Sequence, residues 1–149
     1  MSLENLAKVG QLHRHTARSD DVSRLLAAVQ RNLKDAGRRE ISSETRFDCA
    51  YKAIMQCALI AMMAAGYRPA TNAPGHHQTM IQALPLTLGV NNETWVVLDG
   101  FRKKRNQNDY TGVPISNAEA DEAVARATDL LRTVQAHLKS KHPELVLKG

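Results

Sequence analysis

Apolar residues recur every three or four positions along most of this chain, in long stretches that short polar breaks separate. One stretch runs from Ser19 to Gly37, and a second runs from about residue 45 to Gly66. Such spacing is typical of helices that bury one face. The second half of the second stretch is apolar on every side, which indicates a helix that is buried all round. We therefore predict a central helix there, preceded by a helix that Ser19 caps.

Three more helices are predicted beyond the break "YRPATNAPG". The first begins at His76 and is kinked or ended near Pro85, since proline disrupts a helix interior. The second follows Asn91 or Asn92 and stops near Gly112. The last follows "PISNAE", whose serine and glutamate have the spacing of a capping box. Short connections between long helices favour antiparallel neighbours, so we expect an all-α fold, an up-and-down helical bundle of about five main helices.

The length of 149 residues suits one domain, which buries roughly two thirds of the surface of its unfolded chain. We expect residues 1–149 to form a single helical domain with a core at about 19–140. The segments 1–18 and 143–149 are expected to be peripheral, the second of them loose. "SLENLAKVG" has a short helical pattern, and "QLHRHTARSD" is interpreted as a loop.

The apolar and cysteine positions favour a cytoplasmic location. No basic and apolar leader opens the chain, and the longest nearly apolar run, "AIMQCALIAMMAAG", is too short to span a bilayer. Cys49 and Cys57 lie too far apart along one helix to form a disulfide. We interpret both as reduced core residues and expect no membrane insertion.

The charge of the chain favours an acidic partner. The formal net charge is +5, and clustered Lys and Arg bind nucleic acid by displacing counterions from phosphates. No glycine-rich phosphate loop is found, and neither "HRH" nor "HH" has the spacing that places two imidazoles on one helix face. We therefore expect neither a cofactor nor a metal.

One helix carries an inward face that turns from apolar to polar. At about 100° per residue, Trp95 and Leu98 define the side that should point into the bundle. The same side continues with four polar residues: Arg102, Arg105, Asn106 and Asp109. Lys103 and Lys104 fall elsewhere, toward solvent.

Two interpretations of these polar residues stay open on pattern alone. Arg105 and Asp109 are four positions apart and could form an ion pair on a helix end that protrudes from the bundle. Alternatively, Arg102 and Arg105 could line a polar cleft that holds an anion such as phosphate, which suits the planar donors of arginine.

The segment "RNQNDY" resembles the functional motif of HEPN domains, the higher eukaryotes and prokaryotes nucleotide-binding family. An amphipathic helix precedes it, and "TG" and one more long helix follow. "RFDCAYKAIMQCALIAMMAAGYRPA" with "GHHQTMIQAL" resembles the preceding helical hairpin of that family. The resemblance covers about residues 19 to 140 and implies a HEPN-like bundle.

The resemblance also implies roles for individual residues. Arg105 matches the motif arginine, Asn106 its polar neighbour, and Tyr110 stands where many members have histidine. The catalytic candidates are therefore Arg105, Asn106 and Tyr110. The candidates for binding RNA or a nucleotide are Arg102, Arg105, Asp109 and His76. In active members the RNA 2′-hydroxyl attacks the adjacent phosphate without a metal, and a tyrosine with a pKa near 10 is a poor base for that step.

The resemblance implies partners as well. We expect a homodimer that binds RNA or a nucleotide, in a toxin-antitoxin or defence system with a cognate antitoxin protein. His76 or His77 could supply the acid–base group that the motif lacks. The alternative is a helical interaction or dimerisation module without catalytic activity, in which the polar residues only specify pairing.

Overall fold

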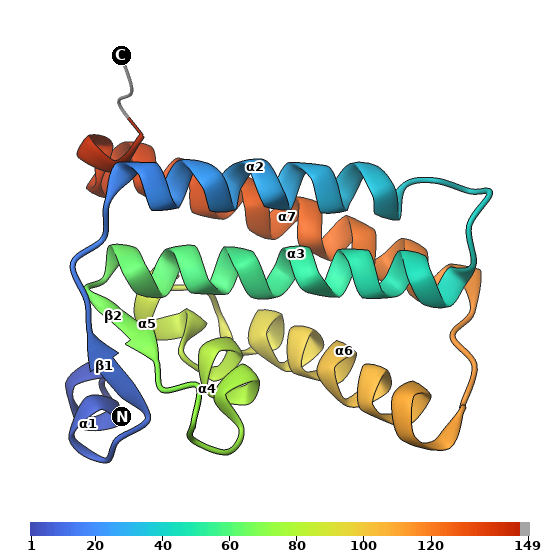
Figure 1. Ribbon diagram of the computed structural model, residues 1–149, viewed down its shortest axis with the longest axis horizontal. Helices are drawn as coiled ribbons and strands as arrows, with labels where there is room; N and C mark the ends of the chain where they lie inside the picture. Colours follow the sequence, from blue (N-terminus) through green and yellow to red (C-terminus); the bar gives the residue numbers. More distant parts are fainter. Residues whose placement is uncertain (147–149) are drawn as a thin grey trace.

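The computed structural model describes residues 1–146 and is built almost entirely from helices (Figure 1). The long helices are α2 (Ser19–Ala36), α3 (Ser43–Ala64), α6 (Asn92–Thr111) and α7 (Asn117–Lys141). The short ones are α1 (Leu3–Lys8), α4 (His76–Gln82), α5 (Leu84–Leu88) and the 3-10 helix Pro143–Leu145. Two short strands, β1 (Leu12–Arg14) and β2 (Tyr67–Pro69), form an antiparallel pair.

The long helices alternate in direction, so the prediction of an all-α helical bundle is confirmed. In Figure 1, α2 and α6 run one way, and α3 and α7 run the opposite way. Helix α3 lies in the middle, packed against α2 and α7, while α4, α5 and α6 cover its other side. The chain therefore places α3 next to almost every other element.

Helix α3 is the buried centre that the sequence predicts. Phe47, Ile54 and Met62 are fully buried, because its apolar residues surround the whole helix rather than one stripe. By length and composition α3 could cross a membrane, but 67% of its most apolar window is buried inside the bundle. The core helix of a globular protein can have the same length and apolar composition as a membrane-spanning helix.

Capping residues fix several helix ends. Ser116 accepts a hydrogen bond from the backbone N–H of Glu119, and the Glu119 side chain accepts one from the N–H of Ser116, which completes the predicted capping box. Asn91 caps α6. The predicted cap at Ser19 is wrong, because Ser19 is the first helical residue and Arg18 takes the N-cap position without a side-chain hydrogen bond.

The end of the chain's fourth helix follows from Pro85. Helix α4 stops at Gln82, and α5 starts at Leu84 with Pro85 in its first turn. Proline has no N–H to donate, and the first turn of a helix does not need one. The chain changes direction at this break, and α4 lies beside both α3 and α6.

The core reaches beyond residues 19–140, which corrects the prediction of two peripheral segments. Leu12, in a segment predicted to be a loop, is buried on β1, and Leu145 is buried in the 3-10 helix. Strands of three residues are too short to show an alternating pattern in sequence. Residues 147–149 of the predicted loose tail lie outside the described part of the chain.

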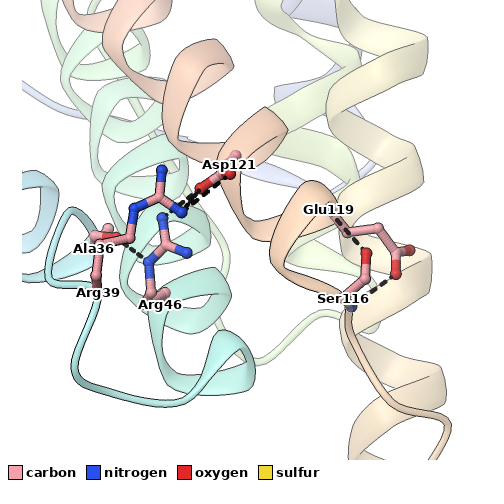
Figure 2. Close-up of polar contacts among 6 residues, drawn as sticks. All are labelled: Ala36, Arg39, Arg46, Ser116, Glu119 and Asp121. Carbon is pink, nitrogen blue, oxygen red and sulfur yellow. Dashed lines mark hydrogen bonds and ion pairs between the residues drawn. The ribbon is translucent and has the colours of Figure 1, made fainter.

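A buried arginine joins three helices at one end of the bundle (Figure 2). Arg46 on α3 is 2% exposed and donates from Nε to the carbonyl oxygen of Ala36 at 2.8 Å. Its Nη2 donates to Asp121 Oδ1 on α7 at 2.6 Å. Arg39 binds the same carboxylate from the exposed side, at 3.0 Å. This cluster fixes the ends of α2, α3 and α7 relative to one another.

Candidate functional site

The inward side of α6 is apolar to Phe101 and carries one buried carboxylate. Leu98 is 1% exposed, Phe101 is buried, and Asp99 is buried between them. Asp99 Oδ1 accepts a hydrogen bond from Arg102 Nε at 2.7 Å. That bond raises the pKa of Arg102, and the pair neutralises a buried carboxylate that would otherwise be costly. Arg102 is therefore largely committed to Asp99.

Arg105 is held differently. Its guanidinium carbon lies 5.1 Å from the ring centroid of Tyr51 on α3, within the range of a cation–π contact. Its Nε lies 3.8 Å from Asp109 Oδ2, so the predicted ion pair forms, but beyond hydrogen-bond distance. With its side chain 36% exposed, Arg105 keeps donors available to a ligand.

Tyr51 connects the arginine to a histidine. The Tyr51 hydroxyl oxygen lies 3.1 Å from Nδ1 of His77 on α4. The His76 ring lies edge-on against the His77 ring, with centroids 4.7 Å apart. Side chains of α3, α4 and α6 thus converge at one point, where His77 lies beside Tyr51 and the candidate binding residue His76 lies against His77.

Two adjoining hollows open at this point and share His77. The first, here called the α3 cleft, has a volume of about 500 Å³. Its lining residues are Asp48, Tyr51, Lys52, Met55, Gln56, Leu59, His77, Met80 and Arg105. The second, here called the α4–α6 cleft, has about 370 Å³. Its lining residues are Gly75, His76, His77, Gln78, Arg102, Asn106 and Tyr110.

Burial and positive charge keep His77 neutral. Burial is the main cause that lowers the pKa of His77, and the neighbouring His76, Arg105 and Arg102 lower it further. Burial raises the pKa of Tyr51 to about 12, so its hydroxyl keeps the proton at neutral pH. His77 is therefore a neutral imidazole shared by the two clefts, with Arg105 in the α3 cleft and Arg102 in the α4–α6 cleft.

The tautomer of His77 decides what its second nitrogen can do. When the Tyr51 hydroxyl donates to Nδ1, the imidazole proton sits on Nε2, and Nε2 is a donor. When Nδ1–H donates to the Tyr51 oxygen, Nε2 has a free lone pair and can accept a proton. The distance of 3.1 Å suits both states. Only the second one lets the neutral imidazole accept a proton at Nε2, and the imidazolium that results can give that proton back.

Three expectations about α6 need correction. Asn106 and Asp109 are exposed in the single chain, although the inward stripe predicts burial. Tyr110 is 85% exposed, although it lines the α4–α6 cleft. Lys104, predicted to be solvated, lies half-buried with its Nζ 3.2 Å from Glu119 Oε2 on α7. The last turns of α6 are therefore more exposed than the stripe alone indicates.

The cysteines do not join the clefts. Cys57 is fully buried, and burial raises the pKa of its thiol to about 12. Cys49, predicted to be a core residue, is half-buried, and burial also raises its pKa. Among residues 1–146, no three His, Cys, Asp or Glu side chains are grouped to hold a metal ion.

Sequence reasoning missed Tyr51, Lys52 and Asp48. Tyr51 occupies an apolar stripe, where an aromatic residue normally fills the core, and Lys52 and Asp48 resemble ordinary surface charges. Helical spacing places all three on one side of α3, but only the packing of α4 and α6 against that helix brings them next to His77 and Arg105. No family model matches the chain, and comparisons with curated proteins and with solved structures found no significant match.

Proposed function

We propose that the protein binds RNA through the α3 cleft and cleaves it without a metal, as a HEPN-like ribonuclease. The observation that supports this most is the position of a neutral His77, hydrogen-bonded to Tyr51, over which Arg105 lies. The motif resemblance lacks a histidine at Tyr110. His77, from the preceding hairpin, supplies that acid–base group in the proposal.

The chemistry needs only groups that the cleft contains. The phosphate lies against Arg105 and Lys52, whose charges stabilise the extra negative charge of the transition state. His77 Nε2 takes the proton of the ribose 2′-hydroxyl, whose oxygen then attacks the adjacent phosphorus. The bond to the 5′ oxygen breaks, and that oxygen takes up a proton from the imidazolium or from water. The products are a 2′,3′-cyclic phosphate and a 5′-hydroxyl.

The setting of this activity is part of the same proposal. A metal-independent ribonuclease of this type would act in the cytoplasm, in a toxin-antitoxin or defence system, as a homodimer that a cognate antitoxin restrains. Support from the chain itself is the exposure of two α6 side chains, Tyr110 near the end of the helix at 85% and Val96 near its start at 54%. An exposed aromatic and an exposed apolar residue on one helix suit a protein contact.

The test is cleavage of a fluorescent single-stranded RNA by the purified full-length protein in the presence of EDTA. Cleavage should fall at least about a hundredfold in His77→Ala and in Arg105→Ala, because each removes a group that acts on the reacting atoms. The matched control is His137→Ala, since His137 is also half-buried but lines neither cleft. A substrate with 2′-deoxy sugars should resist cleavage.

The outcomes separate binding from catalysis. If RNA binds in an Arg105-dependent way but is not cleaved, the protein is a HEPN-like RNA-binding protein without ribonuclease activity. If neither binding nor cleavage is detected, the proposal is wrong.

A second candidate function is a dimerisation or interaction module, which the exposed end of α6 favours. In that case Arg105→Ala should change the oligomeric state, measured by light scattering, and RNA affinity should stay undetectable. An unchanged oligomeric state together with lost RNA binding would exclude it.

A further inference from the structure

The α3 cleft continues into another hollow along the same helix. That hollow is lined by Asp21, Arg24, Leu25, Leu59, Met63 and Arg68. Leu59 lines both hollows, so they adjoin at this side chain. The α3 residues that line them all fall on one side of the helix at 100° per residue. They are Asp48, Tyr51, Lys52, Met55, Gln56, Leu59 and Met63.

Cationic side chains stand at the two ends of this track. Lys52 and Arg105 lie at one end, and Arg68 on β2 lies at the other. Among residues 1–146, neither Lys52 nor Arg68 forms an ion pair, whereas Arg24 next to Arg68 is paired with Asp21. From Lys52 to Met63 the helix rises about 16 Å. Because Met63 lines the same hollow as Arg68, this rise is the approximate spacing of the two ends.

The middle of the track is largely apolar. Leu59 is half-buried, and Met55 beside it is 7% exposed. Methionine makes favourable contacts with aromatic rings through its sulfur. Gln56 uses its Oε1 to accept from Asn32 Nδ2 at 2.8 Å, so it offers N–H donors to a ligand. An apolar surface between two cationic ends matches a short single strand of RNA. The bases of that strand would cover the apolar middle, and its phosphates would reach the cationic ends.

We propose that the surface from Lys52 on α3 to Arg68 on β2 is an extended binding track for single-stranded RNA, with Arg68 as a phosphate-binding residue remote from the cleavage point. This inference rests on the proposed function and names the length of its substrate. A span of about 16 Å corresponds to about five stacked nucleotides at about 3.4 Å each, and to fewer in an extended strand. Mononucleotides and dinucleotides would contact only the Arg105 end.

The experiment measures how affinity depends on length, by fluorescence anisotropy with the full-length protein. The probes are labelled 2′-O-methyl oligouridylates, a dinucleotide and an octanucleotide, which the protein cannot cleave. Arg68→Ala should weaken octanucleotide binding by about fivefold and leave dinucleotide binding unchanged. It should also reduce the slope of log affinity against log salt by about 0.7 for the octanucleotide. Arg68→Glu should weaken octanucleotide binding further.

Control variants separate this inference from the proposed function. Arg126→Ala, at an exposed position of α7 outside all of these hollows, should change neither affinity. Arg105→Ala should weaken both probes. If Arg105→Ala weakens both probes while Arg68→Ala and Arg68→Glu bind the octanucleotide as tightly as the unchanged protein, the track is wrong and the proposed function stands. If neither probe binds the unchanged protein, both proposals fail.

Discussion

Arg46 belongs to α3 and Arg105 packs against that helix, but the two arginines differ in burial and in what their guanidinium groups bind. Arg46 is 2% exposed, and it donates to a backbone carbonyl and to Asp121 at 2.6–2.8 Å. Arg105 is 36% exposed, lies over an aromatic ring, and has its carboxylate partner at 3.8 Å. Nε and Nη2 of Arg46 are held by the protein, and its Nη1 is buried without a hydrogen-bond partner among residues 1–146, whereas the guanidinium of Arg105 has donors that a ligand can reach. An arginine of the second kind is the one to expect in a binding site.

The largest expected effect is on stability, in Arg46→Ala. This change removes a buried side chain and leaves the Ala36 carbonyl without its partner, so it should cost about 3 kcal/mol of unfolding free energy. Arg105→Ala should change that free energy by only about 0.5 kcal/mol, because its ion pair with Asp109 is exposed to solvent. Urea denaturation followed by circular dichroism measures both.

The control for this comparison is Arg39→Ala, which removes the exposed partner of Asp121 and should cost about as little as Arg105→Ala. If Arg105→Ala is as destabilising as Arg46→Ala, then Arg105 is a structural residue, and the comparison between the two arginines breaks down.

The same two regions show what sequence can predict and what it cannot. Helix bounds follow from local signals, so the capping box at Ser116 and the break at Pro85 were predicted within a residue or two. The strands β1 and β2 were missed because three residues carry no readable alternation. Arg46 was missed because a buried arginine has the same letter as an exposed one, and its partner Asp121 is 75 positions away.

The candidate site was predicted in part, for the same physical reason. The stripe of α6 carries Arg102 and Arg105, since helical spacing alone places them on one side. Asp99 lies three positions before Arg102 on the same helix, so helical spacing could have indicated that pair as well. That His77 reaches Tyr51 depends on how α4 docks against α3. Periodicity describes one helix at a time, and contacts between three helices lie beyond it.

A smaller effect is expected on the pH dependence of cleavage. Because burial, His76 and two arginines lower the pKa of His77, the neutral base persists below pH 6.5, and the rate should fall only when pH drops below that lowered value. His76→Gln removes one of these causes, so the acidic limb should move to higher pH. The measurement is the pH–rate profile together with an NMR titration of the His77 ring.

The direction of that shift is the test. In His76→Gln, the acidic limb of the pH–rate profile and the pKa of His77 from NMR could both stay unchanged. That result would mean that another group limits the rate at low pH. A matched control is His13→Gln, because His13 is exposed on β1, far along the chain from the cleft.

The smallest effect is expected at Tyr110, and it decides whether one chain or two build the site. Tyr110 is 85% exposed, so in a site made by a single chain Tyr110→Phe should change cleavage by no more than about twofold. A loss of tenfold or more would place its hydroxyl near the reacting phosphate, either from the α4–α6 cleft of the same chain, which Tyr110 lines together with His77, or from a second copy packed against the end of α6. Light scattering on the same sample separates the two cases, since only the second requires a dimer. An unchanged rate leaves Arg105 and His77 of one chain as the groups that act.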